Sequence, residues 1–352
     1  MLKREKWSIL VLVLVICLSV VGCSSKETQD SQSQEKNEEK EEKEVPKKEW
    51  KYAHIAASPE EIQYIFADKL AEGISSDTSV NVKVFPAGQL GGQDEQVDGI
   101  RTGNIQMAQG VWSALARFVP DLALFDAPYI FRDGKHAMNT TNPNTSPVLD
   151  DLNKQLIDKA GIRIIGGMYR GARHLSTSDF PVYSPDDLKG KKIRGIPNKI
   201  WTNTIIGMGA VPTPIEWAEV QTALMTGVVE GQENPLATLY DFKLYEVQNY
   251  ASLTGHMQAV TAVYVNEEAW QSLTAVEREA TQSHISGLSN ESIKWAAERT
   301  ESMKGKLEEK GMTIIGEEDG LDIEAFRSSV SAQIAQEFPE WVDYIEQIQE
   351  IK

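Results

Sequence analysis

Cysteine is almost absent from the chain, since Cys17 and Cys23 are the only two among its 352 residues. Both stand near the N-terminus, so everything that follows Cys23 lacks a thiol. A folded domain in that part of the chain can hold no disulfide, no thiolate nucleophile and no cysteine-based zinc site. It must therefore be stable through packing alone.

Catalytic and cofactor-binding motifs are also missing. The sequence has no Gly-x-Ser-x-Gly elbow, no His-Glu-x-x-His motif and no phosphate-loop signature. The histidines lack the short spacings of metal ligands and are scattered at His54, His136, His174, His256 and His284. We therefore expect neither an enzyme nor a bound metal or cofactor, although an acid–base site built from carboxylates alone stays open in so acidic a chain.

Positive charge is scarce: 35 lysines and arginines stand against 52 aspartates and glutamates, which gives a net charge of −17. Residues 1–22 contribute +2 to this balance, so the remainder of the chain carries about −19. Such an acidic surface repels nucleic acid and anionic lipid, and we expect neither as a partner. An anionic ligand has to be attracted by local positive charge, against the field of the whole molecule.

There is a single long hydrophobic run, at 9–21, and it follows a basic start. It is too short for a comfortable membrane span and has the length of a signal-peptide core. The run ends in Val20-Val21-Gly22-Cys23, which resembles the bacterial lipobox, where the cysteine is lipidated and becomes the new N-terminus. We predict a signal peptide at 1–22 and a lipid anchor on Cys23 that holds an extracytoplasmic protein at the cell membrane. The alternatives are an ordinary signal peptide with an incidental cysteine and an uncleaved anchor.

The next segment, 24–49, is almost entirely polar and charged, with Val45 as its one sizeable apolar residue. Such a stretch cannot bury enough apolar surface to offset its ordering entropy, so we expect it to be disordered. Residues 23–49 then form a lipidated tether that reaches on the order of 30 Å.

From residue 50 onward, strand-like and helix-like patterns alternate, which predicts an α/β fold. Strands are expected at 50–56, 80–85, 104–109, 162–168, 192–196, 228–232, 260–265 and 313–315. Helices are expected from 59 to about 70, at 94–102, 148–159, 218–225 and 267–310, and again from 323 onward.

Four segments, kept in order and spacing, resemble one family. They are FPAGQLG at 85–91, APYIF at 127–131, GAR at 171–173 with SPDDLKGKKIR at 184–194, and GAVPTPIEWAEVQTAL at 209–224 with TGVVEGQENP at 226–235. Together they look like the substrate-binding subunit of tripartite ATP-independent periplasmic (TRAP) transporters, the DctP family. The resemblance covers the chain from about residue 51 to its end.

This resemblance implies a two-lobe α/β fold of the periplasmic-binding-protein type, with a hinge and a long helix spanning both lobes. Lobe one is expected at 50–170 plus 257–298, and lobe two at 171–256 plus 299–352. The implied function is capture of a small organic acid, such as a dicarboxylate or sugar acid, and its delivery to membrane permease subunits driven by an ion gradient. We expect a monomer.

Arg194 ends a short predicted strand and by resemblance is the family arginine that binds a substrate carboxylate. A guanidinium suits this role because it gives two parallel charged hydrogen bonds and stays protonated when desolvated. Without the resemblance, Arg194 reads as a surface cation in a basic run with Lys189, Lys191 and Lys192.

Further binding residues follow from the same resemblance. Arg173 corresponds to a second, supporting arginine, with Arg170 as a rival for that role. Asn234 precedes Pro235, so its backbone is biased to an extended conformation, and it matches a ligand-binding asparagine. Trp217 matches an aromatic residue that packs on the ligand, although a core anchor is the plain alternative.

In lobe one, His54, with Ile55 and Ala57, is a weaker candidate for the cavity wall. Gln93, Val111 and Trp112 stand where members that bind sialic acid carry acidic contacts, so sialic acid is not expected.

Two other classes share the expected architecture. A binding protein of an ATP-driven (ABC) importer would have a neighbouring ATPase gene. A lipoprotein that serves a sensor would be needed for signalling and not for uptake.

Overall fold

The computed structural model describes residues 47–352. The predicted signal peptide, the predicted lipidation site Cys23 and nearly all of the predicted tether lie outside the described residues. Within them, no helix combines the length and the apolar character that a membrane crossing requires.

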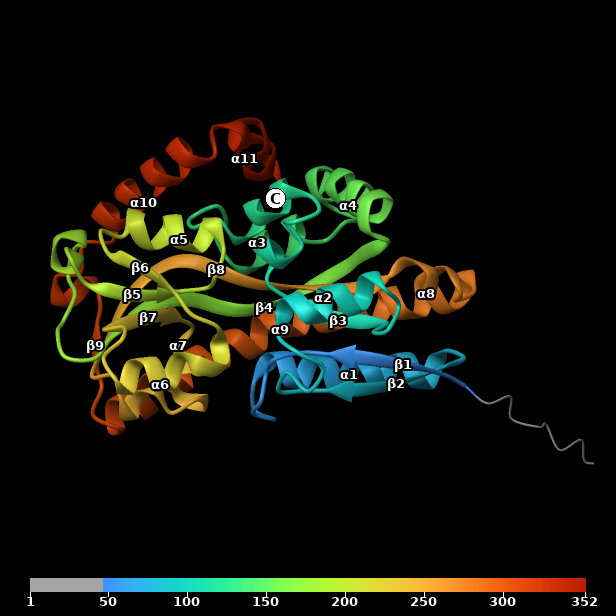
Figure 1. Cartoon of the computed structure of the whole chain (residues 1–352), viewed down its shortest axis with the longest axis horizontal. Helices are drawn as coiled ribbons and strands as arrows, with labels where there is room; N and C mark the ends of the chain where they lie inside the picture. The colour runs from blue at the N-terminus through green and yellow to red at the C-terminus, as the bar shows by residue number, and fades with distance from the viewer. Residues whose placement is uncertain (1–46) are drawn as a thin grey trace, which may run out of the picture. The chain divides into compact units, whose positions relative to one another are not determined.

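One nine-stranded mixed sheet runs through the described residues, in the order β2-β1-β3-β8-β4-β7-β5-β6, with β9 paired to β8 (Figure 1). Its strands are β1 Lys48–Ala53, β2 Val80–Phe85, β3 Met107–Gly110, β4 Ile162–Thr177, β5 Lys192–Gly195, β6 Val211–Pro214, β7 Gly231–Asn234, β8 Tyr250–Asn266 and β9 Thr313–Ile315.

The two long strands β4 and β8 are antiparallel neighbours and connect two groups of shorter strands. β3, which carries β1 and β2 beside it, pairs with β8 near Val265. β7 pairs with the far end of β4, at 174–177, and β9 with the far end of β8, at 250–252. These two groups are the strands of the two lobes, so the predicted two-lobe α/β fold is confirmed.

The helices are α1 Ile62–Asp77, α2 Gln93–Arg101, α3 Gly134–Thr140, α4 Pro147–Ala160, α5 Lys199–Gly207, α6 Val220–Met225, α7 Leu236–Asp241, α8 Glu267–Gln271, α9 Ala275–Glu309, α10 Ile323–Glu337 and α11 Val342–Glu350. Local signals explain several ends. The Ser146 side chain caps α4, and Gly161 (φ 64°) ends it in the left-handed conformation that favours glycine. Thr274 and Glu277 form a capping box at the start of α9.

The longest helix, α9, packs against α1 and β4 and also against α7 (Figure 1). It therefore spans both lobes, as predicted. The last helix, α11, packs against α4, so the C-terminus returns to elements that precede residue 170.

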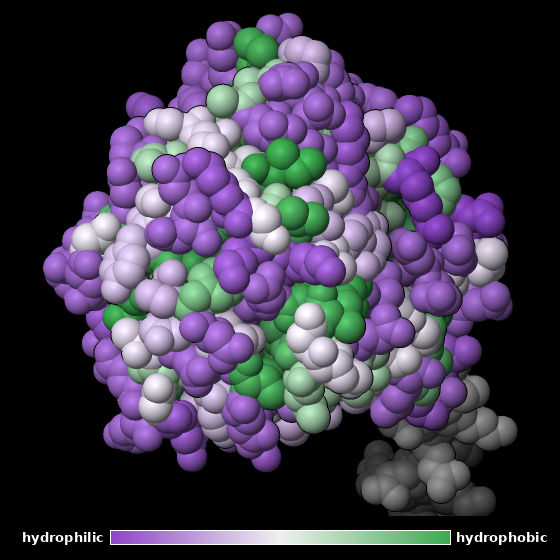
Figure 2. Space-filling model, turned by 60° about the vertical axis from the view of Figure 1, so that its left-hand side comes forward, coloured by the Kyte–Doolittle hydropathy of each residue, from purple (hydrophilic) through white to green (hydrophobic). Residues whose placement is uncertain are grey.

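The core forms two large clusters of buried apolar side chains. Trp112, Trp201 and Trp341 are almost fully buried in the first, and Phe66, Leu70 and Ile74 in the second. Burial of each such side chain contributes about 1.5–3 kcal/mol, which is how a thiol-free domain stays folded. Figure 2 shows one face, on which hydrophilic residues predominate and hydrophobic ones form small separate groups.

Close packing of α5 on α10 depends on a glycine. A Cβ added to Gly207 would lie 2.7 Å from the backbone Cα of Val330. We expect Gly207→Ala to lower the free energy of unfolding by about 1–3 kcal/mol, because backbone and not a flexible side chain has to move. Gly287→Ala, at an exposed position in the interior of α9 with nothing near its Cβ, should instead raise it by up to about 1 kcal/mol.

Urea denaturation of the two variants tests this packing. Equal effects of the two alanines would contradict it.

Candidate functional site

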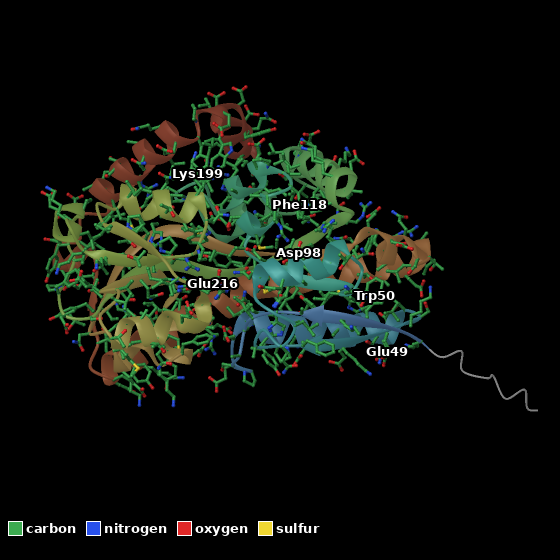
Figure 3. The ribbon with its side chains drawn as sticks, viewed as in Figure 1. Glu49, Trp50, Asp98, Phe118, Lys199 and Glu216 are labelled. Atoms are coloured by element: carbon green, nitrogen blue, oxygen red, sulfur yellow. The ribbon has the colours of Figure 1, made fainter. Side chains whose placement is uncertain are left out.

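A cavity of about 470 Å³ lies between the two lobes. Side chains from the first lobe, from the middle of β4 and from the second lobe line it. Those that matter most for its chemistry are Glu61, Gln93, Ser113, Arg170, Arg173, Arg194, Asn198, Trp217, Asn234, Thr238 and Phe242. Glu216, labelled in Figure 3, lines the cavity from the segment between β6 and α6 and is exposed.

Arg194, on β5, is only 2% exposed and reaches the cavity. Its Nε donates a hydrogen bond of 2.9 Å to the carbonyl of Ile215, and its guanidinium lies 5.7 Å from the Trp217 ring. Among the described residues no carboxylate forms an ion pair with it. Burial lowers the pKa of Arg194 to about 10, so the group remains charged at neutral pH. The cavity therefore contains a buried cation without a protein counter-ion.

Arg173, by contrast, is already paired. Its guanidinium holds Glu233 through two bonds, Nε to Oε2 at 2.5 Å and Nη2 to Oε1 at 2.8 Å. His256 Nε2 lies 3.0 Å from the same Oε2. Burial opposes ionisation of Glu233, but Arg173 and His256 outweigh it and hold its pKa at about 2. Arg173 lines the cavity with its charge neutralised.

Arg170 reaches the same cavity because of a β-bulge. Residues three apart point to opposite faces of a regular strand, so Arg170 and Arg173 should face opposite ways. The register of β4 against β8 shifts between Tyr169 and Gly171, which makes Arg170 the extra, unpaired residue. Both arginines then line the cavity, and Arg170 Nη2 lies 3.4 Å from Thr238 Oγ1.

Asn234 ends β7 and is oriented by a chain of buried hydrogen bonds. Its Nδ2 donates to Gln232 Oε1 (2.6 Å), and Gln232 Nε2 donates to Ser176 Oγ (2.6 Å). Ser176 Oγ in turn donates to Gln248 Oε1 (2.9 Å). The chain fixes the Asn234 side chain at the cavity wall, where an amide can bond to a ligand.

Trp217 is half-buried and stands edge-to-face with Phe242, with ring centroids 4.6 Å apart. The two rings form an apolar wall next to Arg194. His54 is not brought to the cavity: it is fully buried between Tyr52 and Tyr64, and burial lowers its pKa to about 4. The next residues along the chain, Ile55 and Ala56, line the cavity in its place.

Sequence reasoning missed several cavity residues, above all Glu61, Ser113 and Asn198. Asn198 caps α5 and donates from Nδ2 to the carbonyl of Ser113 (3.1 Å), while Trp201 Nε1 donates to Ser113 Oγ (3.1 Å). These bonds join the two lobes beside the cavity. Asn198 follows Pro197 and precedes an apolar stretch, a helix-start pattern that could have revealed α5.

The sequence model of the family described as bacterial extracellular solute-binding protein, family 7 (DctP), matches residues 52–340. A solute-binding protein of Roseobacter denitrificans is 31% identical over 291 residues, which are 82% of this chain and 87% of that protein. The 2,3-diketo-L-gulonate-binding periplasmic protein of Escherichia coli is 30% identical over 296 residues, or 82% and 88% of the two chains.

Solved structures agree with these matches. A TRAP periplasmic solute-binding protein from Bordetella bronchiseptica, with density attributed to pantoate, superimposes with a TM-score of 0.79 at 28% identity. It covers 87% of this chain and 100% of its own. The structure of the same Roseobacter denitrificans protein, with bound L-galactonate, gives a TM-score of 0.76 at 28% identity and covers 86% and 99%.

The buried ion pair beside the cavity generates a stability prediction. Glu233→Gln should lower the free energy of unfolding by about 3–5 kcal/mol at neutral pH, because it leaves the buried charge of Arg173 unpaired. Since the pKa of Glu233 is about 2 in the folded protein and 4.5 ordinarily, its ionisation stabilises the fold above pH 4.5. The wild type should lose this contribution as the pH falls from 4.5 to about 2, and the variant should not show that loss.

Urea denaturation across this pH range measures both effects. Glu298→Gln, which removes an exposed partner of Lys294 on α9, is the matched control and should change stability little. A Glu233→Gln protein as stable as this control would contradict the prediction.

Proposed function

Because the chain belongs to family 7 of the bacterial extracellular solute-binding proteins, the DctP family, we propose that it captures a small organic acid and delivers it to the membrane subunits of an ion-gradient-driven TRAP permease. The family is one of solute-binding proteins and not of enzymes. One observation supports the ligand class above all others: Arg194 is a buried cation that lines the cavity without an ion-pair partner among the described residues.

The relatives support the same class. Their names and titles give 2,3-diketo-L-gulonate for the Escherichia coli protein, pantoate for the Bordetella protein and L-galactonate for the Roseobacter protein. Each of these molecules carries a carboxylate. A buried guanidinium is the group best suited to bind one, through two parallel charged hydrogen bonds.

The proposed binding event starts with the ligand carboxylate on Arg194. Asn234, oriented by its hydrogen-bond chain, bonds to a ligand oxygen, and the rings of Trp217 and Phe242 cover an apolar face of the ligand. Arg173 lines the same wall as the second basic residue. Closure of the lobes expels water, which strengthens the ion pair and favours the closed form that the permease recognises.

Arg194→Ala should cost about 3–5 kcal/mol of binding free energy, because the ligand carboxylate is then enclosed without a partner. The purified protein is first screened by thermal shift against small organic acids, with neutral sugars and amino acids alongside. A bound ligand raises the melting temperature by mass action. The affinity of the best acid is then measured by calorimetry for both proteins. Near-normal affinity in the variant would remove Arg194 from the site.

Arg194→Lys separates geometry from charge. Lysine keeps the positive charge but cannot form the bidentate bond, so we expect it to leave most of the affinity lost. Full rescue by lysine would indicate point-charge attraction instead. A clear thermal shift with a neutral sugar, and none with any acid, would contradict the proposed ligand class.

We also propose that Cys23 carries the lipid that anchors the protein outside the cytoplasmic membrane. Cys23→Ala should abolish incorporation of labelled palmitate into the protein, since that residue carries the acyl chains. Cys17→Ala is the matched control, because the predicted signal peptide contains Cys17 and is removed. Palmitate incorporation into Cys23→Ala would contradict the anchor.

A further inference from the structure

Two further charged residues, Glu61 and Arg170, line the cavity in addition to Arg194. Glu61, only 6% exposed, stands at the start of α1, where its Oε1 accepts hydrogen bonds from the backbone of Ala57 (2.9 Å) and Ser58 (3.0 Å). The described residues give its Oε2 no hydrogen-bond donor. Arg170 comes from the bulge in β4, and the one hydrogen bond that its side chain makes with the described residues is the long bond to Thr238.

The two groups are close enough to influence each other and yet do not touch. Burial raises the pKa of Glu61, and the charge of Arg170 acts against that rise. Burial likewise lowers the pKa of Arg170, and Glu61 acts against that fall. However, no nitrogen of Arg170 lies within 4.0 Å of a Glu61 oxygen, the limit for an ion pair. Both side chains line the same cavity.

Two of the buried acids near the cavity have arginine partners of their own. Glu233 is neutralised by Arg173. Asp241 forms an ion pair with Arg299 at 2.6 Å and influences Arg170 only by longer-range electrostatic attraction. Arg194, Arg170 and Glu61 then remain, together with the buried Asp126, whose carboxylate accepts a hydrogen bond from the backbone N–H of Ser113 and whose pKa burial raises to about 6. The other acidic lining residues are exposed to solvent, where water and salt screen them, namely Asp94, Glu95 and Glu216. Glu61 therefore opposes a second carboxylate on a ligand whose first carboxylate is bound by Arg194.

We propose that Glu61 and Arg170 make the site specific for a monocarboxylate that places a hydroxyl group between them, and that they reject dicarboxylates. This inference rests on the proposed function of the same site. A hydroxyl both donates and accepts, so it can bond to Glu61 Oε2 and to the Arg170 guanidinium together. A carboxylate in that position is attracted by Arg170 but repelled by Glu61. An ammonium group is attracted by Glu61 but repelled by Arg170.

The test uses pairs of acids that differ only in the last carbon: D-gluconate with D-glucarate, and L-threonate with L-tartrate. In each pair the first acid ends in a hydroxymethyl group and the second in a carboxylate. For at least one pair, we expect the wild-type protein to bind the monocarboxylate more tightly by about tenfold or more in calorimetry. Tighter binding of the dicarboxylate in both pairs, or binding of none of the four acids, would overturn the inference.

Variants of the pair should change this preference in opposite directions. Glu61→Gln removes the repulsion, so the preference for the monocarboxylate should fall by about tenfold. Arg170→Gln removes the positive charge beside Glu61, so it should increase the preference for the monocarboxylate while it weakens the binding of both acids. Because the two changes have opposite signs, a loss of folding in one variant still leaves the other as a test. If a folded variant binds the two acids of a pair with the same affinity ratio as the wild type, the inference is contradicted.

Glu60→Gln is the matched control, because Glu60 is the exposed neighbour of Glu61 and carries the same charge outside the cavity lining. This variant should leave the ratio of the affinities for the two acids unchanged to within about twofold. Arg194→Ala separates the two proposals. If binding depends on Arg194 but dicarboxylates are preferred, only the present inference is wrong. If binding of every acid is indifferent to Arg194, the proposed function itself is wrong.

Discussion

The ion pair between Arg173 and Glu233, joined by His256, is the interaction on which the site depends. It takes one residue from each of three neighbouring strands, β4, β7 and β8, at the place where the lobes meet. Each residue alone would be costly to bury, and together they are compatible with the interior because every charge has a partner. Their mutual neutralisation leaves Arg194 as a buried cation in the cavity wall that no carboxylate of the described residues pairs with.

The crossing strands give the same region its geometry. β4 and β8 run from one lobe to the other, and the two cavity residues of β4, Arg170 and Arg173, stand next to irregularities in its pairing with β8. The bulge at Arg170 turns a side chain toward the cavity that a regular strand would direct away from it. Irregular pairing at these positions therefore places two arginines on one wall, and only one of them has a carboxylate in direct contact.

Much of the fold and part of the site could be predicted from sequence. The motifs around Arg194 and Asn234 identified residues that do line the cavity, because these short segments carry both the strand ends and the binding groups. His54 does not line the cavity, because it follows β1 and is buried between Tyr52 and Tyr64, a packing that the sequence pattern does not reveal. The pairing of Arg173 with Glu233 could not be inferred either, because it depends on the register between β4 and β7. The full lengths of β4 and β8 were underestimated, because Gly171 and Gly255 interrupt their apolar pattern.

One edge of the sheet has a further consequence. β6 is the last strand in the order, and the backbone N–H groups of Val211 and Ile215 point inward, to the carbonyls of Lys191 and Gly195. Pro212 and Pro214 fall on the alternate positions, whose nitrogens face outward and carry no hydrogen. A strand from another molecule would find carbonyl acceptors there but few donors. The two prolines thus protect this open edge against the strand-to-strand association from which aggregates grow.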